Sequence, residues 1–311
     1  DEYDAASQAF LRTVVAQLEG HPMHVVLTGE HSILEAATPR CTVHPGLLDA
    51  DAVRALLRQA FGGRLPGDAS VVDTILGSSQ GNVFHAAQAV RVLAEGGTDV
   101  DLSLPDLLQL RVGRLATDAL RLMQALCILG RETPRTRAQA LYGDDEQFDD
   151  ALELLRRRGM VESVGKDRLR VTHASLADAV REMMPADARQ RLHRHALALL
   201  TAEGADPIHL ARHASEARTG DESLTVLRRA GERAEQRLDD HGAARHYRRA
   251  LHMARWELLL DEGDDRCLEL ALRLGDALSF TGDPQAAALV IKEALTSGTR
   301  PPATEARLLR S

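Results

Sequence analysis

The chain has 311 residues and a formal net charge of −8, with 38 Lys and Arg against 46 Asp and Glu. This balance excludes a general attraction to nucleic acid or to an anionic membrane surface. Hydrophobic residues make up 44% of the sequence and aromatic residues only 3%, which indicates a globular protein whose helices pack through small and aliphatic side chains. At this length we expect two or three domains.

Residues 1–46 predict one helix followed by two extended segments. Phe10, Val14 and Leu18 share one helical face, and the extended segments follow as the apolar run at 24–28 and the piece at 41–44. Helix and strands in this order are typical of a parallel α/β sheet, but two strands cannot form a stable sheet alone. We therefore expect residues 1–46 to be the C-terminal part of an α/β domain.

Residues 47–98 predict an all-helical block. Three helices are expected here, over 50–60, 69–76 and 82–95. Asp49 and Asp68 are suitable N-caps for the first two of them, because a carboxylate can accept the free backbone N–H groups of a first turn.

Residues 99–185 predict helices followed by a β-hairpin. Helices are expected over 105–114, 117–129, 136–142, 145–158 and 175–184, with hairpin strands at 160–164 and 168–172. Helices that precede a two-stranded wing are the order of a winged-helix domain, so we assign that fold to this block.

Residues 186–311 are expected to be helical and to contain a repeat. Four residues recur 44 positions later: Gly231, Ala243, Tyr247 and Ala250 match Gly275, Ala287, Ile291 and Ala294. This spacing of small residues is typical of a tetratricopeptide helix pair. Small residues let the two helices approach closely, and we expect Tyr247 or Ile291 to fill the space between units. Since the repeat is longer than usual, the helix that runs through Trp256 is expected to be extended.

Two stretches of the sequence resemble functional sites, but an ordinary structural role is the preferred interpretation of each. The stretch from Gly159 to Asp167 superficially resembles a phosphate-binding loop, but its spacing is wrong and a hairpin turn is the preferred interpretation. His209 and His213 have an i, i+4 spacing that can bind a metal, but no third ligand is placed by spacing. We predict no metal site and no catalytic residue, because no activated nucleophile is recognisable.

The triplet Arg156, Arg157 and Arg158 precedes the hairpin and could contact DNA in a winged-helix domain. Basic and acidic residues nearly balance between 101 and 200, whereas a nucleic-acid domain should show a basic excess. The triplet also stands where a helix C-terminus favours cations. Binding of nucleic acid is therefore not expected.

The three cysteines, Cys41, Cys127 and Cys267, are far apart and have no paired spacing. They indicate buried thiols in a reducing compartment. No apolar run approaches the length of a membrane span and no signal peptide precedes Asp1, so a cytoplasmic protein without a membrane partner is expected.

The order of these blocks resembles the STAND class of signalling ATPases, and in particular bacterial multidomain regulators. In these, the N-terminal effector is often a serine/threonine kinase or a cyclase, and other members carry a DNA-binding domain at the far end. Several local strings carry the resemblance: DAAS at 4–7, GNVF at 81–84, VTHASL at 171–176 and RQRLH at 189–193. The resemblance implies a mainly α chain: the end of a P-loop NTPase domain (1–46), a helical lid (47–98), a winged helix (99–185) and tetratricopeptide-like repeats (186–311).

The resemblance also implies three residues near a nucleotide. His173 matches the winged-helix histidine that reaches the β-phosphate of bound ADP in the class, and Asn82 and Phe84 belong to the lid turn. The alternative for His173 is that it only caps the turn before a helix. Two positions depart from the family pattern: Glu30 replaces an arginine that senses phosphate, and Val83 replaces a proline that lies against adenine.

The resemblance leads to one expected function with two alternatives. The expected function is the regulatory part of a nucleotide-switched signalling ATPase, whose repeats bind a protein partner and control an effector outside this chain. ATP or ADP with Mg²⁺ would be cofactors of the full-length protein. This chain should not be catalytic alone, because it contains no phosphate-binding loop, and Asp1 and Glu2 are expected to lie just past the magnesium-binding acids. The alternatives are a nucleotide-free scaffold and a transcriptional regulator, and a homo-oligomer is left open.

Overall fold

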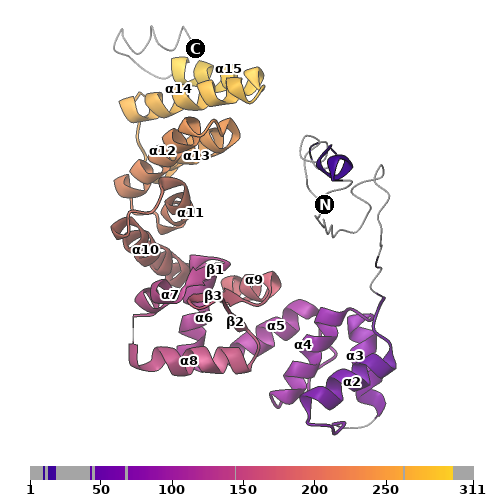
Figure 1. Cartoon of the computed structure of the whole chain (residues 1–311). Helices are drawn as coiled ribbons and strands as arrows, with labels where there is room; N and C mark the ends of the chain where they lie inside the picture. Colours follow the sequence, from indigo (N-terminus) through magenta and orange to yellow (C-terminus); the bar gives the residue numbers. More distant parts are fainter. Residues whose placement is uncertain are drawn as a thin grey trace. The chain divides into compact units, whose positions relative to one another are not determined.

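A computed structural model gives the fold of the chain and describes residues 10, 13–18, 43, 46–66, 69–143, 145–261 and 263–296 (Figure 1). The chain divides into two compact units, Asp1–Leu48 and Asp49–Ser311. In the first unit, Phe10 and residues 13–17 are helical, and Phe10 is largely exposed. The strands predicted at 24–28 and 41–44 lie outside the described residues, apart from Val43, which belongs to no element.

The second unit is mainly helical and begins with four helices. These are α2 (Ala50–Ala60), α3 (Ala69–Ser79), α4 (Val83–Ala94) and α5 (Leu104–Gly113). The Asp49 side chain accepts a hydrogen bond from the Ala52 backbone N–H at 2.8 Å, which confirms the predicted cap. Asn82 caps α4 in the same way by accepting from the His85 N–H at 3.0 Å. Asp68 lies outside the described residues.

Next along the chain, helices enclose a small antiparallel sheet. The elements are α6 (Thr117–Leu129), β1 (Glu132–Pro134), α7 (Arg135–Tyr142), α8 (Asp145–Arg157), β2 (Val161–Val164), β3 (Arg168–Val171) and α9 (Ala174–Met183). The predicted hairpin is confirmed, since β2 pairs with β3, and Gly165 in the turn has a φ of 63°. The region from Gly159 to Asp167 is therefore no phosphate-binding loop.

The sheet has one strand more than expected. The prediction of a two-stranded wing was incomplete, because β1 pairs with the other side of β3 and gives the strand order β1-β3-β2. Three residues are too short to show an alternating pattern, and Pro134 cannot donate a hydrogen bond to a ladder. Pro134 is tolerated because β1 is an edge strand.

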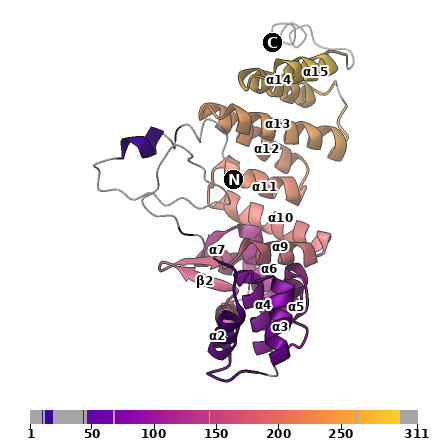
Figure 2. The same cartoon turned by 90° about the vertical axis from the view of Figure 1, so that its right-hand side faces the viewer.

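The rest of the described chain is a stack of helices. These are α10 (Ala186–Ala202), α11 (Pro207–Ala217), α12 (Asp221–Gln236), α13 (Asp240–His252), the π-helical turn η1 (Met253–Glu257), α14 (Asp265–Phe280) and α15 (Pro284–Thr296). Each helix packs on the next one in sequence, and α10 also packs on α6 and α7 (Figures 1 and 2). We call α10–α15 the array.

The predicted repeat corresponds to two helix pairs of the array. Gly231 on α12 faces Tyr247 on α13, and Gly275 on α14 faces Ile291 on α15. We expected Tyr247 and Ile291 to fill the space between units, but each packs inside its own pair, against the glycine of the partner helix. A side chain at either glycine would hold the two helices apart. Tyr247 also lies 6.0 Å from the Arg273 guanidinium, and so contacts the following pair.

The helix through Trp256 is extended, as the repeat length predicts. The extension is a π-helical turn, since α13 continues directly into η1 and ends at Glu257. Leu259 then takes a positive φ of 51° as the chain turns toward α14.

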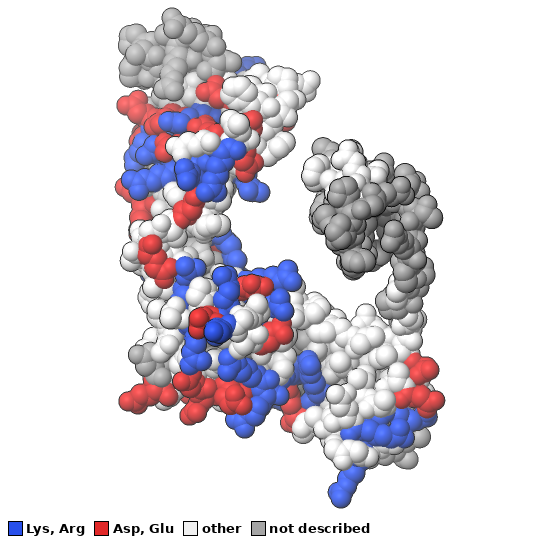
Figure 3. Space-filling model, viewed as in Figure 1, with Lys and Arg blue, Asp and Glu red and all other residues white. Residues whose placement is uncertain are grey.

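On the face that Figure 3 shows, basic and acidic side chains are interleaved over the array and over α6–α9. In the array, the Arg273 guanidinium forms ion pairs with three carboxylates, those of Glu232, Glu235 and Glu269. None of the helices in the described part of the chain combines the length and apolarity needed to cross a bilayer.

Candidate functional site

The residues predicted to lie near a nucleotide come from two parts of the second unit. Phe84 stands in the first turn of α4, and His173 lies between β3 and α9. Their rings stack at a centroid distance of 3.7 Å and an interplanar angle of 19°. Asn82 is the N-cap of α4, two residues before Phe84. The first turn of α4 is therefore in contact with the turn between β3 and α9.

His173 caps α9. Its Nδ1 atom accepts a hydrogen bond from the Ser175 backbone N–H at 3.2 Å, so the capping role weighed as the alternative is present. Because Nδ1 acts as acceptor, the neutral imidazole carries its proton on Nε2. The exposed ring thus has one N–H that can be donated to a ligand, and Phe84 fixes the ring plane.

One feature of this junction suits a phosphate group. The Nε2–H of His173 is a suitable donor to a phosphate oxygen. Val83, where the resemblance noted in the sequence would place a proline, is 53% exposed and so presents apolar surface at this turn. The second departure, Glu30, lies outside the described residues.

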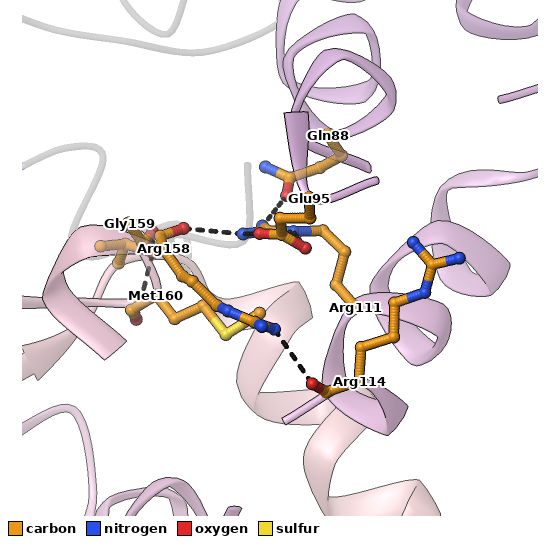
Figure 4. A network of polar contacts seen from close by, with 8 residues as sticks. Gln88, Glu95, Arg111, Arg114, Arg158, Gly159 and Met160 are labelled. Atoms are coloured by element: carbon orange, nitrogen blue, oxygen red, sulfur yellow. Dashed lines mark hydrogen bonds and ion pairs between the residues drawn. The ribbon is translucent and has the colours of Figure 1, made fainter. Parts of the chain in front are cut away.

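A buried arginine joins the same two parts of the unit, and the sequence analysis missed it. Arg111 on α5 is fully buried and donates hydrogen bonds to three acceptors (Figure 4). Its Nη2 lies 2.7 Å from Glu95 Oε1 and 2.7 Å from the Arg158 carbonyl oxygen, and its Nη1 lies 2.5 Å from Gln88 Oε1. Gln88 lies on α4, Glu95 caps that helix and Arg158 follows α8, so one side chain ties three helices together.

A second hydrogen bond links the end of α8 to the end of α5. The Arg158 guanidinium donates to the Arg114 carbonyl oxygen at 3.2 Å. Arg91, one turn before Glu95 on α4, has a pKa lowered by burial and by the positive charge of Arg111. A buried guanidinium is tolerated only when its hydrogen bonds are made, so this network specifies one arrangement of α4, α5 and the end of α8.

The arginine triplet that could have contacted DNA makes contacts within the chain. Arg156 donates to the Ser163 hydroxyl, and Arg157 lies 3.7 Å from the Glu153 carboxylate. Arg158 is held by the Arg111 network. The triplet thus connects α8 to β2 and to α5.

The array contains a pair of buried histidines that spacing did not identify. His209 is exposed, whereas His213 is buried with its ring centroid 5.1 Å from that of His193 on α10. Burial lowers the pKa of His193 to about 3 and that of His213 to about 4. The neighbouring His213 adds to the lowering for His193, and Arg212 adds to it for both histidines. Within the described residues, no group of three or more His, Cys, Asp or Glu side chains is placed to hold a metal ion.

Comparison with known proteins identifies no family for this chain. A scan against protein-family models finds no match, and a search of curated proteins finds no relative. Among solved structures, the chain is similar to a signal transduction ATPase with numerous domains (STAND) protein with a tetratricopeptide repeat sensor from Pyrococcus horikoshii. The TM-score is 0.43 and the identity 13%, over 80% of this chain and 41% of that one. The chain spans about two fifths of that protein's length, and a likeness of this degree does not establish a common fold.

Proposed function

We propose that this chain is the regulatory portion of a nucleotide-switched signalling ATPase of the STAND type. In this proposal the array is the sensor that binds a protein partner. Residues 99–185, which hold α5–α9 and the sheet, are a winged helix, and helices α2–α4 are the lid. The effector, a serine/threonine kinase domain in the favoured version, lies outside the chain.

The observation that carries the proposal is the stacking of the array. Successive helices pack on their sequence neighbours, and the Gly231–Tyr247 and Gly275–Ile291 contacts recur at the same places in two pairs. Repeats of this kind present an extended surface, which suits a protein ligand better than a small molecule. The packing of α10 on α6 and α7 connects that surface to the Phe84–His173 junction.

The nucleotide part of the proposal rests on His173. When ADP is bound in the full-length protein, its negatively charged phosphates would lie beside the two turns that contain Phe84 and His173. His173 would donate its Nε2–H to a phosphate oxygen while Nδ1 keeps capping α9. Loss of that donor would free the β3–α9 turn to move away from α4.

Release of a fluorescent ADP analogue from the full-length protein tests this part. His173→Asn can keep an acceptor that caps α9 but removes the Nε2–H. A hydrogen bond to a charged group is worth about 1.5–3 kcal/mol, so His173→Asn should speed release by at least about tenfold. His195→Asn is the matched control, because His195 is exposed on α10. Equal release rates from both variants and the unchanged protein would contradict a nucleotide role for His173.

Chemical cross-linking tests the partner surface, because the chain has only two lysines. Lys292 lies on α15 of the array, and Lys166 lies in the hairpin turn between β2 and β3. With an amine-reactive cross-linker in cells, we expect the partner to be linked through Lys292, and the link to disappear in Lys292→Arg. Links through Lys166 without links through Lys292 would move the partner site to the hairpin and refute the sensor role.

A further inference from the structure

A pocket of about 320 Å³ lies in the array where the end of α11 faces the π-helical turn η1. Six residues line it: Arg218, Gly220, Met253, Trp256, Glu257 and Leu258. The first two belong to the α11–α12 turn, in which Arg218 and Gly220 both take positive φ angles, of 50° and 69°. The other four come from η1 and the residue after it.

The wall of the pocket is an exposed indole. Trp256 is the only tryptophan of the chain and is 71% exposed, although tryptophan is largely buried in most proteins. Below it, Met253 is buried and Leu258 is half-buried, and Leu258 lies against the α11–α12 turn. Tryptophan, methionine and arginine are the residue types enriched where proteins bind one another.

The charges around the pocket are unequal. Glu257 is held by Arg249, whose Nη1 lies 2.7 Å from Oε1 and whose Nη2 donates to the Ser215 carbonyl oxygen at 2.9 Å. Arg218 is only loosely attached, with its Nε 3.7 Å from Glu257 Oε2 and its side chain 63% exposed. His252 lies 3.9 Å from Glu257 Oε1 and adds positive charge when protonated. Two guanidinium groups therefore share one carboxylate.

We propose that this pocket binds an acidic side chain, flanked by an aliphatic residue, in a segment of the partner protein. The partner's carboxylate pairs with the open side of the Arg218 guanidinium, and its aliphatic neighbour lies on Trp256 and Leu258. The charge of Arg218 argues for this occupant: Arg249 already pairs with Glu257 at 2.7 Å, whereas Arg218 is exposed and lies 3.7 Å from that carboxylate. This inference rests on the proposed sensor role of the array and specifies the kind of side chain that the array recognises in its partner.

The single tryptophan makes the pocket directly observable. The probes are acetylated peptides Ala-Leu-Glu-Leu-Ala amide and its counterparts with Gln or Lys in place of Glu, added to the whole chain. The Glu peptide should shift the Trp256 emission saturably at millimolar concentration. One exposed ion pair predicts that the Gln peptide binds about fivefold more weakly and the Lys peptide more weakly still.

Matched variants locate the effect. Arg218→Gln should abolish the difference between the Glu and Gln peptides, whereas Arg229→Gln, an exposed arginine on α12, should keep it. The inference is overturned if no peptide shifts the emission, if Glu and Gln peptides bind equally to the unchanged chain, or if the Lys peptide binds best, since that last result would assign recognition to Glu257.

The same variants separate this inference from the sensor role. If Arg218→Gln leaves the Lys292 cross-link to the partner unchanged, the partner binds elsewhere on the array and only the pocket inference fails. If the Glu peptide binds as expected but the partner is linked through Lys166 alone, the pocket stands and the proposed sensor role fails.

Discussion

Gly231 of α12 and Tyr247 of α13 are so close that a Cβ atom at residue 231 would stand 2.4 Å from Tyr247 Cε1. The next pair repeats the relationship more loosely, since a Cβ atom at Gly275 would stand 2.8 Å from Ile291 Cδ1. A planar ring cannot move aside as an aliphatic terminus can. The Gly231–Tyr247 contact is thus the tighter of the two.

Replacing Gly231 by alanine should destabilise the chain. The added methyl group must displace the Tyr247 ring, and overpacking of this kind costs about 1–3 kcal/mol. Gly77→Ala is the matched control, because Gly77 lies within α3 with nothing within 4 Å of its Cβ position, so helix propensity should stabilise it by about 0.5–1 kcal/mol. Urea unfolding of both variants measures the difference, and a shift in the same direction for both would show that the contact is not tight.

Replacing Arg111 by methionine should loosen the junction of α4, α5 and α8. The change leaves Glu95 and Gln88 without their donor, and breaking a buried ion pair costs about 3–5 kcal/mol. Hydrogen exchange should accelerate first at residues 158–160 and along α4. Arg54→Met, which removes an exposed pair with Asp51, should change stability by less than about 0.5 kcal/mol. Uniform acceleration across the array would contradict a local role.

Stability should fall on acidification through the buried histidine pair. The pKa values of His193 and His213 are lowered to about 3 and about 4, below the value of about 6.5 expected in an unfolded chain. The unfolded state therefore binds more protons below about pH 6.5, and the contribution of each neutral histidine is lost as the pH falls from there toward its folded pKa.

Two variants isolate this effect from the titration of carboxylates. His213→Leu should make the decline in stability between about pH 6.5 and 4 shallower, by up to about 1.4 kcal/mol per pH unit. His195→Gln, on the exposed side of α10, should leave the slope unchanged. Equal slopes for His213→Leu and the unchanged chain, measured by urea unfolding at several pH values, would refute the prediction.

Cys127 should resist alkylation in the folded chain. It is buried in α6, and burial raises the pKa of its thiol to about 12, so very little thiolate exists near pH 8. After treatment with iodoacetamide, mass spectrometry should find the Cys127 peptide unmodified until denaturant is added. Rapid modification in buffer alone would show that α6 opens locally.

Much of the helical framework follows from local signals. Asp49 and Asn82 begin α2 and α4 because their side chains accept the first free N–H groups, and the hairpin turn at Gly165 needs a residue that tolerates positive φ. The repeat was recognisable because glycines at close approaches cannot vary freely. The expected burial of Cys127 and Cys267 is confirmed, while Cys41 lies outside the described residues.

The contacts that matter most for the candidate site are not local. His193 and His213 meet across two helices, and no spacing rule connects residues that far apart. Arg111 did leave a signal, because it follows Leu107 and Leu108 on the buried stripe of α5, where a charged residue requires a partner. Its partners, Glu95 and the Arg158 carbonyl oxygen, depend on the tertiary fold. The Phe84–His173 stack was expected only as nearness to a shared ligand.

The packing of each array helix on its neighbours has a mechanical consequence. Small changes of angle at successive helix–helix interfaces add up along the stack, so the array can bend without breaking any one interface. An applied force is then shared among many contacts. The Arg111 network has one satisfied geometry and is stiff by comparison. Bending of the array therefore acts on the rest of the unit through the packing of α10 on α6 and α7.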